Sequence, residues 1–589
     1  MRLTAAVFLV VSALVFIRPD PVEAWSSDDR AVAVFGHQDY SHSPYPYSVV
    51  VDSSGNIYTT GKFGSAGAGN EPVDFDPGPG TANLTPNGRH DAFVSKLDSS
   101  GDLVWAKSFG GGETEESLSV AVDSSGNVYT TGRFMATVDF DPGAGTEELT
   151  AVATHDIFVS KLDSSGNYVW AKNFGAFAGM FSFNRGEAVA VDSSDNVYIT
   201  GSFTGTVDFD PGPGTANLTA GCASCNDKTF VLKLDSSGNL VWVKPIGSRT
   251  VTSIALDSSG NVYTTGDFKD TADFDPGAGT TNLTQNGNGY DAFVSKLDSS
   301  GDLVWAKSFG GSGSQSLDSN SVAVDSSGNV YTTGKLRGTA DFDPGPGTTN
   351  LTSVAGTDVF VSKLNSSGDL VWAANFGGDS TSAERGTSVT VDSSGNAYFT
   401  GEFTGPADFD PGAGTTTLTP APPNNASDCP CNREVFVLKL GSSGDLVWAK
   451  SFGNYLGDQV ESVAVDSSGN VYTTGRSYGT VDFDPGPGTT NLGGDNGNAF
   501  VSKLDSSGNL APAVAATPGT PGFTLSTTSV SVTESGTTAT FSVVLDSQPA
   551  GDVVIYAFSS DPGEAQVGAP LTFTSSNWDT PQNFTITGR

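Results

Sequence analysis

The stretch Val-Asp-Ser-Ser-Gly-Asn-Val-Tyr at residues 122–129 recurs along this chain, with small changes, in seven copies. The copies are 65 to 74 residues apart, and their aspartates are Asp52, Asp123, Asp192, Asp257, Asp325, Asp392 and Asp466. Self-similarity at a long period is typical of architectures built from like modules that stack on one another. The sequence therefore predicts a repetitive scaffold. It does not favour an ordinary enzyme site, which needs one asymmetric constellation of residues.

One repeat contains four predicted strands and two tight turns. In the second copy the strands are predicted at residues 119–122, 127–132, 157–162 and 168–175. Asp-Ser-Ser-Gly turns join them into two hairpins, because Asp accepts backbone hydrogen bonds and Gly adopts positive φ. Two hairpins and one loop make a four-stranded antiparallel sheet, and no run has helical spacing. Such a sheet must stack on like sheets, which favours the blade of a β-propeller over a β-helix or a string of sandwiches.

The two ends of the repeat array complement each other. The seventh copy reaches Leu510-Ala511-Pro512 where its fourth strand should be. Residues 31–36, Ala-Val-Ala-Val-Phe-Gly, match that missing strand, including its Phe-Gly ending. We therefore predict an all-β fold in which residues 25–510 form a seven-bladed β-propeller closed by an N-terminal strand. Closure would remove the open sheet edges of a linear array.

Two segments of the repeat carry a resemblance to a known family. These are Ser-Val-Ala-Val-Asp-Ser-Ser-Gly-Asn-Val-Tyr-Thr-Thr-Gly at 119–132 and Phe-Val-Ser-Lys-Leu-Asp-Ser-Ser-Gly-Asp-Leu-Val-Trp-Ala-Lys-Ser-Phe-Gly-Gly at 93–111. They resemble the bacterial SBBP family of β-propeller repeats, and the resemblance covers about residues 31–510. It implies a propeller in an extracytoplasmic setting. It implies no defined activity, because propellers host many unrelated functions.

An acidic motif, Asp-Phe-Asp-Pro-Gly-x-Gly, lies between the second and third strands of every repeat. In an extended chain its two carboxylates lie on one side and its Phe on the other, so we expect the Phe to be buried. All seven loops should open on one face, and the Asp-Ser-Ser-Gly turns on the opposite face. Two interpretations stay open: each Asp caps its own turn, or each pair holds a structural Ca²⁺ with backbone carbonyls. The candidate ligands are Asp74, Asp76, Asp139, Asp141, Asp208, Asp210, Asp273, Asp275, Asp341, Asp343, Asp408, Asp410, Asp482 and Asp484.

The first 24 residues are predicted to be a secretory signal peptide. Arg2 supplies the positive end, residues 3–17 are an apolar run too short for a membrane span, and Val22-Glu23-Ala24 offers a cleavage site before Trp25. No later segment is apolar and long enough to cross a membrane, so no transmembrane segment is expected in the mature chain. We therefore expect a secreted or cell-surface protein.

Three other residue types recur with the repeat. The pairs Cys222/Cys225 and Cys429/Cys431 lie at the same place in copies three and six. In an exported chain they could form local disulfides or, together, a four-thiolate zinc site. The Lys of Val-Ser-Lys-Leu is expected to be solvated. Six tryptophans in the fourth strand are expected to pack between blades rather than to bind sugar: Trp105, Trp170, Trp242, Trp305, Trp372 and Trp448.

The C-terminal part has a different composition. Residues 511–521 are rich in Pro and small residues, as in a linker. Residues 522–589 contain short alternating strands and predict a small β-sandwich. The run Ser-Val-Thr-Glu-Ser-Gly-Thr-Thr-Ala-Thr-Phe-Ser-Val-Val-Leu at 531–545 resembles the opening of Calx-β-like domains of surface proteins, in which Glu534 would match an early acidic Ca²⁺ ligand. The chain stops at Arg589, where further ligands would be expected, so we expect an incomplete domain in a truncated chain.

Charge and motif content narrow the function classes. The net charge is −37 and the pI about 4.1, which makes nucleic acid and anionic membranes poor partners. The four histidines lack metal-ligand spacing, and no nucleophile elbow or phosphate-binding loop is present. The sequence thus favours a non-catalytic binding or adhesion scaffold, expected to be a monomeric propeller with an extracellular protein or glycan ligand. The alternatives are a purely structural extracellular scaffold or a propeller-fold lyase or hydrolase.

Overall fold

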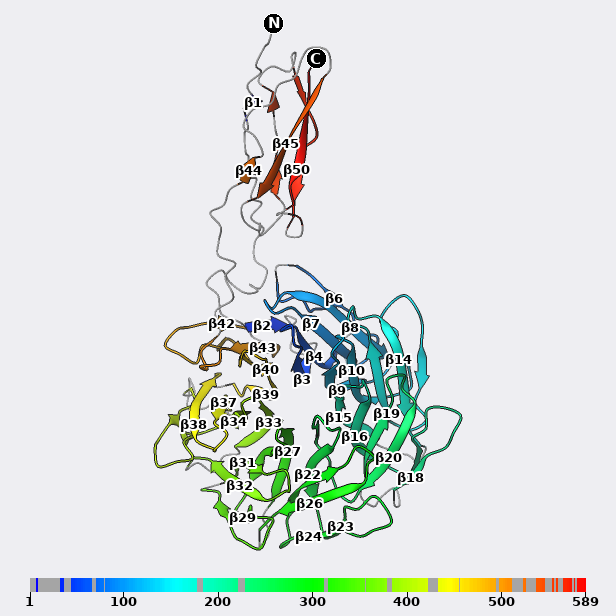
Figure 1. The fold of residues 1–589 in the computed structure, drawn as a ribbon, viewed down its shortest axis with the longest axis vertical. Coiled ribbons are helices and arrows are strands. Elements are labelled where there is room, and N and C mark those ends of the chain that lie inside the picture. The colour runs from blue at the N-terminus through cyan, green and yellow to red at the C-terminus, as the bar shows by residue number, and fades with distance from the viewer. Residues whose placement is uncertain are drawn as a thin grey trace. The chain divides into compact units, whose positions relative to one another are not determined.

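The fold comes from a computed structural model, which describes a defined part of the chain (Figure 1). The described residues are 7–8, 32–35, 44–65, 70–78, 80–176, 184–220, 228–311, 316–354, 356–378, 384–421, 433–454, 456–493, 497–510, 523–525, 537–545, 553–555, 558–559, 565–574, 577 and 580–588. Every regular element assigned over these residues is a β-strand, so the all-β class is confirmed. Residues 22–513 form one compact unit, and residues 1–21 with 514–589 form another.

The second repeat shows why the sequence folds as a sheet. Its strands are β9 (Glu116–Val122), β10 (Val128–Phe134), β13 (Asp156–Leu162) and β14 (Tyr168–Phe174), all antiparallel and in chain order. At the first turn the Asp123 carboxylate accepts hydrogen bonds from the amides of Ser125 and Asn127, the Asn127 side chain and the Tyr129 hydroxyl. Gly126 takes a φ of 79°, which glycine adopts without steric cost. This turn ties the hairpin together in every repeat.

The remaining repeats form the same four-stranded sheet, and we number the sheets in chain order. Sheet 7 has three strands from its own repeat. The strands are β3 (Tyr45–Val51), β4 (Ile57–Phe63), β7 (Asp91–Leu97) and β8 (Leu103–Gly111) in sheet 1; β15 (Arg185–Val191), β16 (Val197–Phe203), β19 (Lys228–Leu234) and β20 (Leu240–Ile246) in sheet 3; β21 (Ser253–Leu256), β22 (Val262–Phe268), β25 (Asp291–Leu297) and β26 (Leu303–Phe309) in sheet 4; β27 (Leu317–Val324), β28 (Val330–Leu336), β31 (Asp358–Leu364) and β32 (Leu370–Phe376) in sheet 5; β33 (Arg385–Val391), β34 (Ala397–Phe403), β37 (Glu434–Leu440) and β38 (Leu446–Phe452) in sheet 6; and β39 (Gln459–Val465), β40 (Val471–Ser477) and β43 (Asn498–Leu504) in sheet 7.

The acidic motifs form short hairpins between the second and third strands. The hairpin β11–β12 also pairs with β8 of sheet 1, where Val138 faces Gly111, so this hairpin docks on the preceding sheet. The hairpins are β5 (Val73–Asp74) with β6 (Asn83–Leu84), β11 (Thr137–Asp139) with β12 (Glu148–Thr150), β17 (Thr206–Asp208) with β18 (Asn217–Thr219), β23 (Thr271–Asp273) with β24 (Asn282–Thr284), β29 (Thr339–Asp341) with β30 (Asn350–Thr352), β35 (Ala407–Asp408) with β36 (Thr417–Leu418), and β41 (Val481–Asp482) with β42 (Asn491–Leu492).

The N-terminal strand occupies the fourth position of the last sheet. β2 (Val32–Phe35) pairs antiparallel with β43, with Ala33 opposite Val501, as the sequence predicts. Each first strand contacts the first strand of the next sheet, and β3 contacts β39 in the same way. The amide of Val49 donates to Ser462 Oγ at 3.3 Å, just as the amide of Val120 donates to Ser48 Oγ at 3.4 Å. The first and last sheets therefore meet as neighbouring sheets do elsewhere, and the first strands surround a common centre (Figure 1).

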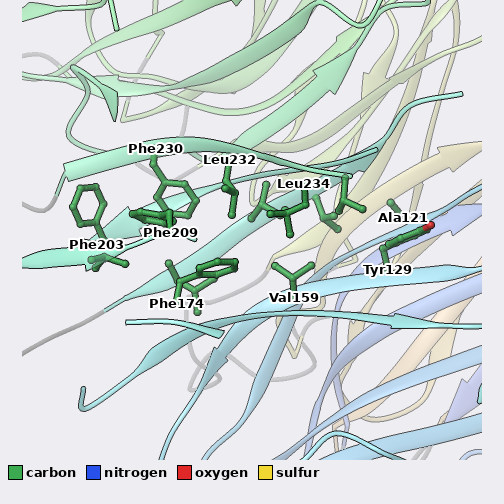
Figure 2. Packing of buried hydrophobic residues seen from close by; sticks show 14 of the residues in the cluster. Ala121, Tyr129, Val159, Phe174, Phe203, Phe209, Phe230, Leu232 and Leu234 are labelled. Carbon is green, nitrogen blue, oxygen red and sulfur yellow. The ribbon is translucent and has the colours of Figure 1, made fainter. Parts of the chain in front are cut away.

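The core lies between neighbouring sheets. In Figure 2, Phe174 of sheet 2 lies beside Phe209 of the next acidic hairpin, near Phe203 and Phe230 of sheet 3, while Tyr129 lies at the other end of the same cluster near Ala121; all are buried. Burial of one such side chain stabilises the fold by about 1.5–3 kcal/mol. The tryptophans reinforce these interfaces, because each indole Nε1 donates to a serine carbonyl in the turn of the next sheet. These bonds, at 3.1–3.3 Å, confirm the predicted packing role of Trp105, Trp170, Trp242, Trp305, Trp372 and Trp448.

The second unit is also built from strands. β44 (Phe523–Leu525), β45 (Thr538–Leu545), β50 (Gln582–Gly588) and β48 (Ala565–Val567) form one sheet, and β46 (Val553–Ile555) pairs with β49 (Leu571–Phe573). The side chains of Val543, Phe573 and Phe584 are buried. A short strand inside the predicted signal peptide, β1 (Val7–Phe8), pairs with β47 (Phe558–Ser559). Over the described residues, no helix is long and apolar enough to cross a bilayer.

Candidate functional site

The fourteen predicted metal ligands form hydrogen bonds within their own hairpins. In the second repeat, Asp139 Oδ1 accepts from the amides of Asp141 at 3.0 Å and Glu147 at 2.8 Å, and Asp141 Oδ1 accepts from the amide of Gly143 at 2.8 Å. The same three bonds are present in every copy, so the structure supports the capping interpretation. The corresponding pairs are Asp74/Asp76, Asp208/Asp210, Asp273/Asp275, Asp341/Asp343, Asp408/Asp410 and Asp482/Asp484.

The phenylalanine between each pair of aspartates is buried, as predicted. The ring of Phe140 lies 5.4 Å from Phe134 and 5.1 Å from Phe158 in its own sheet, and 5.8 Å from Phe109 of sheet 1. Each hairpin is thereby anchored across an interface. Hairpins such as β18, β24 and β29 lie at the periphery of the ring (Figure 1).

Metal binding by the acidic motifs stays a prediction. Each carboxylate uses its Oδ1 oxygen for the hydrogen bonds that cap the hairpin. Among the described residues, no group of three or more His, Cys, Asp or Glu side chains is placed to hold a metal ion. The paired cysteines, Cys222/Cys225 and Cys429/Cys431, lie outside the residues that the structure describes.

A second set of residues distinguishes the repeats from one another. Three positions in each repeat make up this set. The first and second lie at the start of the first strand, seven and five residues before the Asp of the first turn. The third lies at the end of the second strand, four residues after its Tyr. The first and third are cross-strand partners, as Glu116 and Arg133 are. We call these positions the mouth. They are Tyr45, Tyr47, Lys62; Glu116, Leu118, Arg133; Arg185, Glu187, Ser202; Thr250, Thr252, Asp267; Asp318, Asn320, Lys335; Arg385, Thr387, Glu402; Gln459, Glu461 and Arg476.

The backbone has a β-bulge at one of the mouth positions. In sheet 3, Gly186 faces Gly201 and Ala188 faces Thr200, so Glu187 is the extra residue. The same shift is present in sheets 1, 2, 5, 6 and 7. A bulge redirects a side chain and is common next to functional sites. The bulge places a side chain that differs from sheet to sheet near the centre of the ring.

In the ion pairs at the mouth and next to it, the cation is consistently more exposed to solvent than its carboxylate partner. The Arg249 side chain is 47% exposed and its partner Asp267 only 8%. Glu402, fully buried, binds Arg385 at 3.1 Å and Arg433, which precedes β37, at 3.3 Å. The cation is also the more exposed partner in the pairs Lys62–Glu116, Arg133–Glu116, Arg185–Glu187 and Lys335–Asp318. In each of these pairs the cation is thus more exposed than its carboxylate partner.

Electrostatics hold the Glu116 carboxylate in its charged form. Burial alone would raise its pKa, but the hydrogen bonds and charges of Lys62, 2.6 Å away, and Arg133, 2.7 Å away, outweigh burial and lower the pKa. Between sheets 7 and 1, by contrast, burial raises the pKa values of the paired groups. There the Tyr45 hydroxyl donates to Glu461 at 2.9 Å, and burial followed by the charge of Glu461 raises the pKa of Tyr45. Burial also raises the pKa of Glu461.

Pairs of buried carboxyl groups lie on the same side of the sheets as the mouth. Burial raises the pKa of Asp91 to about 7 and that of neighbouring Glu115 to about 8. The same cause raises the pKa of Glu384 to about 7, with a further contribution from Asp358. Asp458, with a pKa raised to about 7, stands beside Glu434 in the same relation. These groups are protonated near neutral pH far more than surface carboxylates are.

Room for these carboxyl groups comes from the Phe-Gly ending of the fourth strand. The position that a Cβ would occupy at Gly377 overlaps the Asp358 carboxyl, and the same holds for Gly310 and Asp291. The sequence gives no direct sign of this relationship, because the two residues of each pair are far apart in the repeat. It could have been suspected from the recurrence of Gly after Phe in this strand.

The opposite face carries grooves between neighbouring turns. One cavity of about 340 Å³ is lined by Asp392, Tyr398, Lys439 and Asp466, and one of about 450 Å³ contains Lys363. Lys439 lies 4.9 Å from the centroid of the Tyr398 ring and donates to the Ser506 carbonyl at 3.4 Å. The expectation that this recurring lysine is solvated is therefore wrong, because it packs on the tyrosine opposite and bridges two sheets. An ion pair on this opposite face has the reverse arrangement, with the carboxylate more exposed than the cation. The Lys244 side chain is 22% exposed and that of its partner Asp302 is 70% exposed.

Comparisons with known proteins agree with a propeller. The family model of the SBBP β-propeller repeat matches residues 304–335 and 447–481, each running from a fourth strand through the second strand of the next sheet. The uncharacterized WD repeat-containing protein L264 of Acanthamoeba polyphaga mimivirus is 24% identical over 495 residues, covering 70% of this chain and 34% of the relative. Regulatory protein FlaEY of Caulobacter vibrioides is 25% identical over 169 residues, covering 28% of this chain and 16% of the relative. The chain spans about a third or less of the length of these curated relatives.

Two of the solved structures that resemble this chain are a set of WD40 repeats and a propeller, both of low sequence identity. The WD40 repeats of RRP9 are 10% identical with a TM-score of 0.39, covering 82% of this chain and 99% of that chain. The Dos1 propeller is 9% identical with a TM-score of 0.35, covering 81% of this chain and 94% of that chain. The predicted resemblance to the SBBP β-propeller repeat is confirmed for the two matched segments of this chain.

Proposed function

We propose that residues 25–510 form one closed seven-bladed β-propeller that acts as a non-catalytic binding scaffold, exported to the cell surface or beyond. The predicted signal peptide supports export. The Phe35–Phe75 contact and the Val49–Ser462 hydrogen bond support closure. The C-terminal unit, proposed as a Calx-β-like sandwich, would serve as a spacer or a second adhesive module.

The mouth is proposed as the binding face for a protein partner. One observation carries this proposal: the turns and acidic hairpins are nearly the same in all copies, while the mouth positions differ from sheet to sheet. A purely structural ring would have no need for that difference at its centre. The differences also create an asymmetric surface, which a single partner requires for a unique orientation.

Calcium is proposed as a structural ligand of the acidic hairpins. The second oxygen of each carboxylate and nearby backbone carbonyls are ligand types that Ca²⁺ prefers. Bound there, the ion would stiffen the periphery of the ring and take no part in partner binding.

Site-specific cross-linking in the native host tests the binding proposal. A photoreactive amino acid is placed at Asn320, in the mouth, or at Ser326, in a turn on the opposite face. We expect a discrete protein adduct from the probe at 320 and none from the probe at 326. Equal adducts from both positions, or no adduct from either, would contradict the proposal.

A further inference from the structure

The mouth differs in charge from the protein that surrounds it. The whole chain carries a net charge of −37, and its acidic hairpins lie at the periphery. In seven ion pairs at or next to the mouth, however, the cation is the more exposed partner: Lys62, Arg133, Arg185, Arg249, Lys335, Arg385 and Arg433. Their carboxylate partners lie deeper. An approaching molecule would therefore meet guanidinium and ammonium groups first.

Salt limits the repulsion from the rest of the chain. At about 0.15 M ionic strength the Debye length is about 8 Å, so distant exposed carboxylates are largely screened from a group in contact with the mouth. Arginine also suits carboxylate recognition, because its planar guanidinium can donate two parallel hydrogen bonds. The charged groups at the mouth therefore act on a bound molecule more strongly than the distant carboxylates do.

Tyrosines at the mouth and next to it are already in contact with cations. The Arg249 guanidinium lies 4.5 Å from the Tyr290 ring centroid, and Arg476 lies 5.6 Å from Tyr45 and 5.2 Å from Tyr478. A sugar-binding platform needs an uncovered aromatic face. Because a guanidinium covers one face of each of these rings, they are less suited to stacking on a sugar. Stacking of this kind also holds the charged group in place, which reduces the entropy lost on binding.

We propose that the mouth binds an acidic peptide segment of the partner through the segment's Asp and Glu carboxylates. This inference rests on the proposed function and specifies the chemistry of the partner. The carboxylates would replace water on Lys335, Arg385 and Arg433.

The test measures the affinity of a labelled eight-residue peptide with four Glu against the full-length chain at 150 mM NaCl. The matched peptide has four Gln in the same places. We expect the Glu peptide to bind at least tenfold more tightly. The variant Lys335→Gln/Arg433→Gln should weaken its binding about fivefold, since each exposed pair is of modest strength. Glu402 keeps Arg385 as its partner in this variant.

The control is Lys244→Gln/Lys307→Gln, which removes the same charge from lysines that lie over turns on the opposite face. It should bind the Glu peptide like the unaltered chain, and Lys335→Arg should do the same. Equal affinities for the two peptides, or equal losses in the two double variants, would overturn the inference. Tighter binding of an oligogalacturonate of equal charge would overturn the choice of a peptide. After any of these results, a protein adduct from the probe at position 320 would still support the proposed function, although the inference about an acidic peptide would be wrong.

Discussion

The ring of Phe35 lies 6.3 Å from the ring of Phe75, although one residue belongs to the N-terminal strand of sheet 7 and the other to the acidic hairpin of sheet 1. Within the array the same contact joins consecutive sheets, as between Phe309 and Phe342 at 5.5 Å. The interface between the last and first sheets thus repeats the chemistry of the others. Closure also brings Tyr45 of sheet 1 against Glu461 of sheet 7, and so completes the mouth.

Replacing Gly377 by alanine should destabilise the propeller by roughly 2–3 kcal/mol, because the added methyl would overlap the buried Asp358 carboxyl. The measurement is the free energy of unfolding in urea. Gly112→Ala is the control, since a Cβ there meets no atom within 4 Å. Similar costs for the two substitutions would show that the carboxyl does not depend on the glycine.

Stability should fall as the pH rises from 5 to 8. The carboxyls of Asp91, Asp291, Glu115, Glu384 and Asp458 have pKa values raised by burial to about 7, 6, 8, 7 and 7. A raised carboxyl pKa means that the folded state binds the proton more tightly. This contribution is complete below the unfolded pKa of about 4 and is lost as the pH rises through the folded values.

Two other sets of groups oppose this trend at lower pH. In the turn aspartates, such as Asp123, burial acts to raise the pKa, but hydrogen bonds from Asn127 and Tyr129 outweigh it and lower the pKa. Their contribution is lost as the pH falls below about 4. Burial lowers the pKa of His90 and His155, which favours unfolding below about pH 6.5. Denaturant titrations at pH 5 and 8 check the sign, and Asp91→Asn/Glu115→Gln should flatten the dependence. A higher stability at pH 8 would contradict the assignment of buried, protonated pairs.

Glu402→Ala should cost roughly 1.5–3 kcal/mol, because it removes the buried carboxylate that binds both Arg385 and Arg433, whose partly exposed side chains water can then solvate. Asp318→Ala, which removes the partly exposed partner of Lys335, should cost about 1 kcal/mol or less. Chemical unfolding of both variants gives the comparison. Equal losses would mean that burial of the glutamate contributes little.

Removal of Ca²⁺ by a chelator should lower the melting temperature if the acidic hairpins hold the ion. Calorimetric titration of Ca²⁺ into the chelator-treated full-length chain should then show several sites. Asp141→Asn keeps a capping oxygen but removes charge, so it should weaken one site without unfolding its hairpin. Absence of both heat and a thermal shift would leave the fourteen carboxylates as hairpin caps alone.

The repeat sequence predicts the strands because its turn chemistry is local. Asp123, Asn127 and Tyr129 lie within seven residues of one another and bond to one another. The first strand was expected at 119–122 and begins at Glu116, because the bulge at Leu118 interrupts the alternation that marks a strand. The closing strand could also be predicted, because residues 31–36 share the sequence pattern of the fourth strand that the seventh repeat lacks.

Contacts between repeats could not be predicted in the same way. Lys161 packs on Tyr129 because strand pairing places them opposite each other, and it reaches Ser236 of the next sheet. Asp91 and Glu115 look like surface residues in the sequence, yet they come from adjacent repeats and are buried at their interface. The mouth positions could not be predicted from the shared motif, because they are the positions at which the seven copies differ. Aligning the seven copies and reading the differences would have found it.

Ring closure is tested most directly by an engineered cross-link between Ala33→Cys and Val501→Cys. These residues are buried cross-strand partners in β2 and β43, and such pairs lie within the Cα separation that a disulfide spans. Under mild oxidation the account predicts an intramolecular disulfide between positions 33 and 501, identified by peptide mass spectrometry. The matched pair Ala33→Cys with Val294→Cys, at the equivalent place in sheet 4, should not form it. Free thiols or cross-linked dimers from the 33/501 pair would contradict closure by the N-terminal strand.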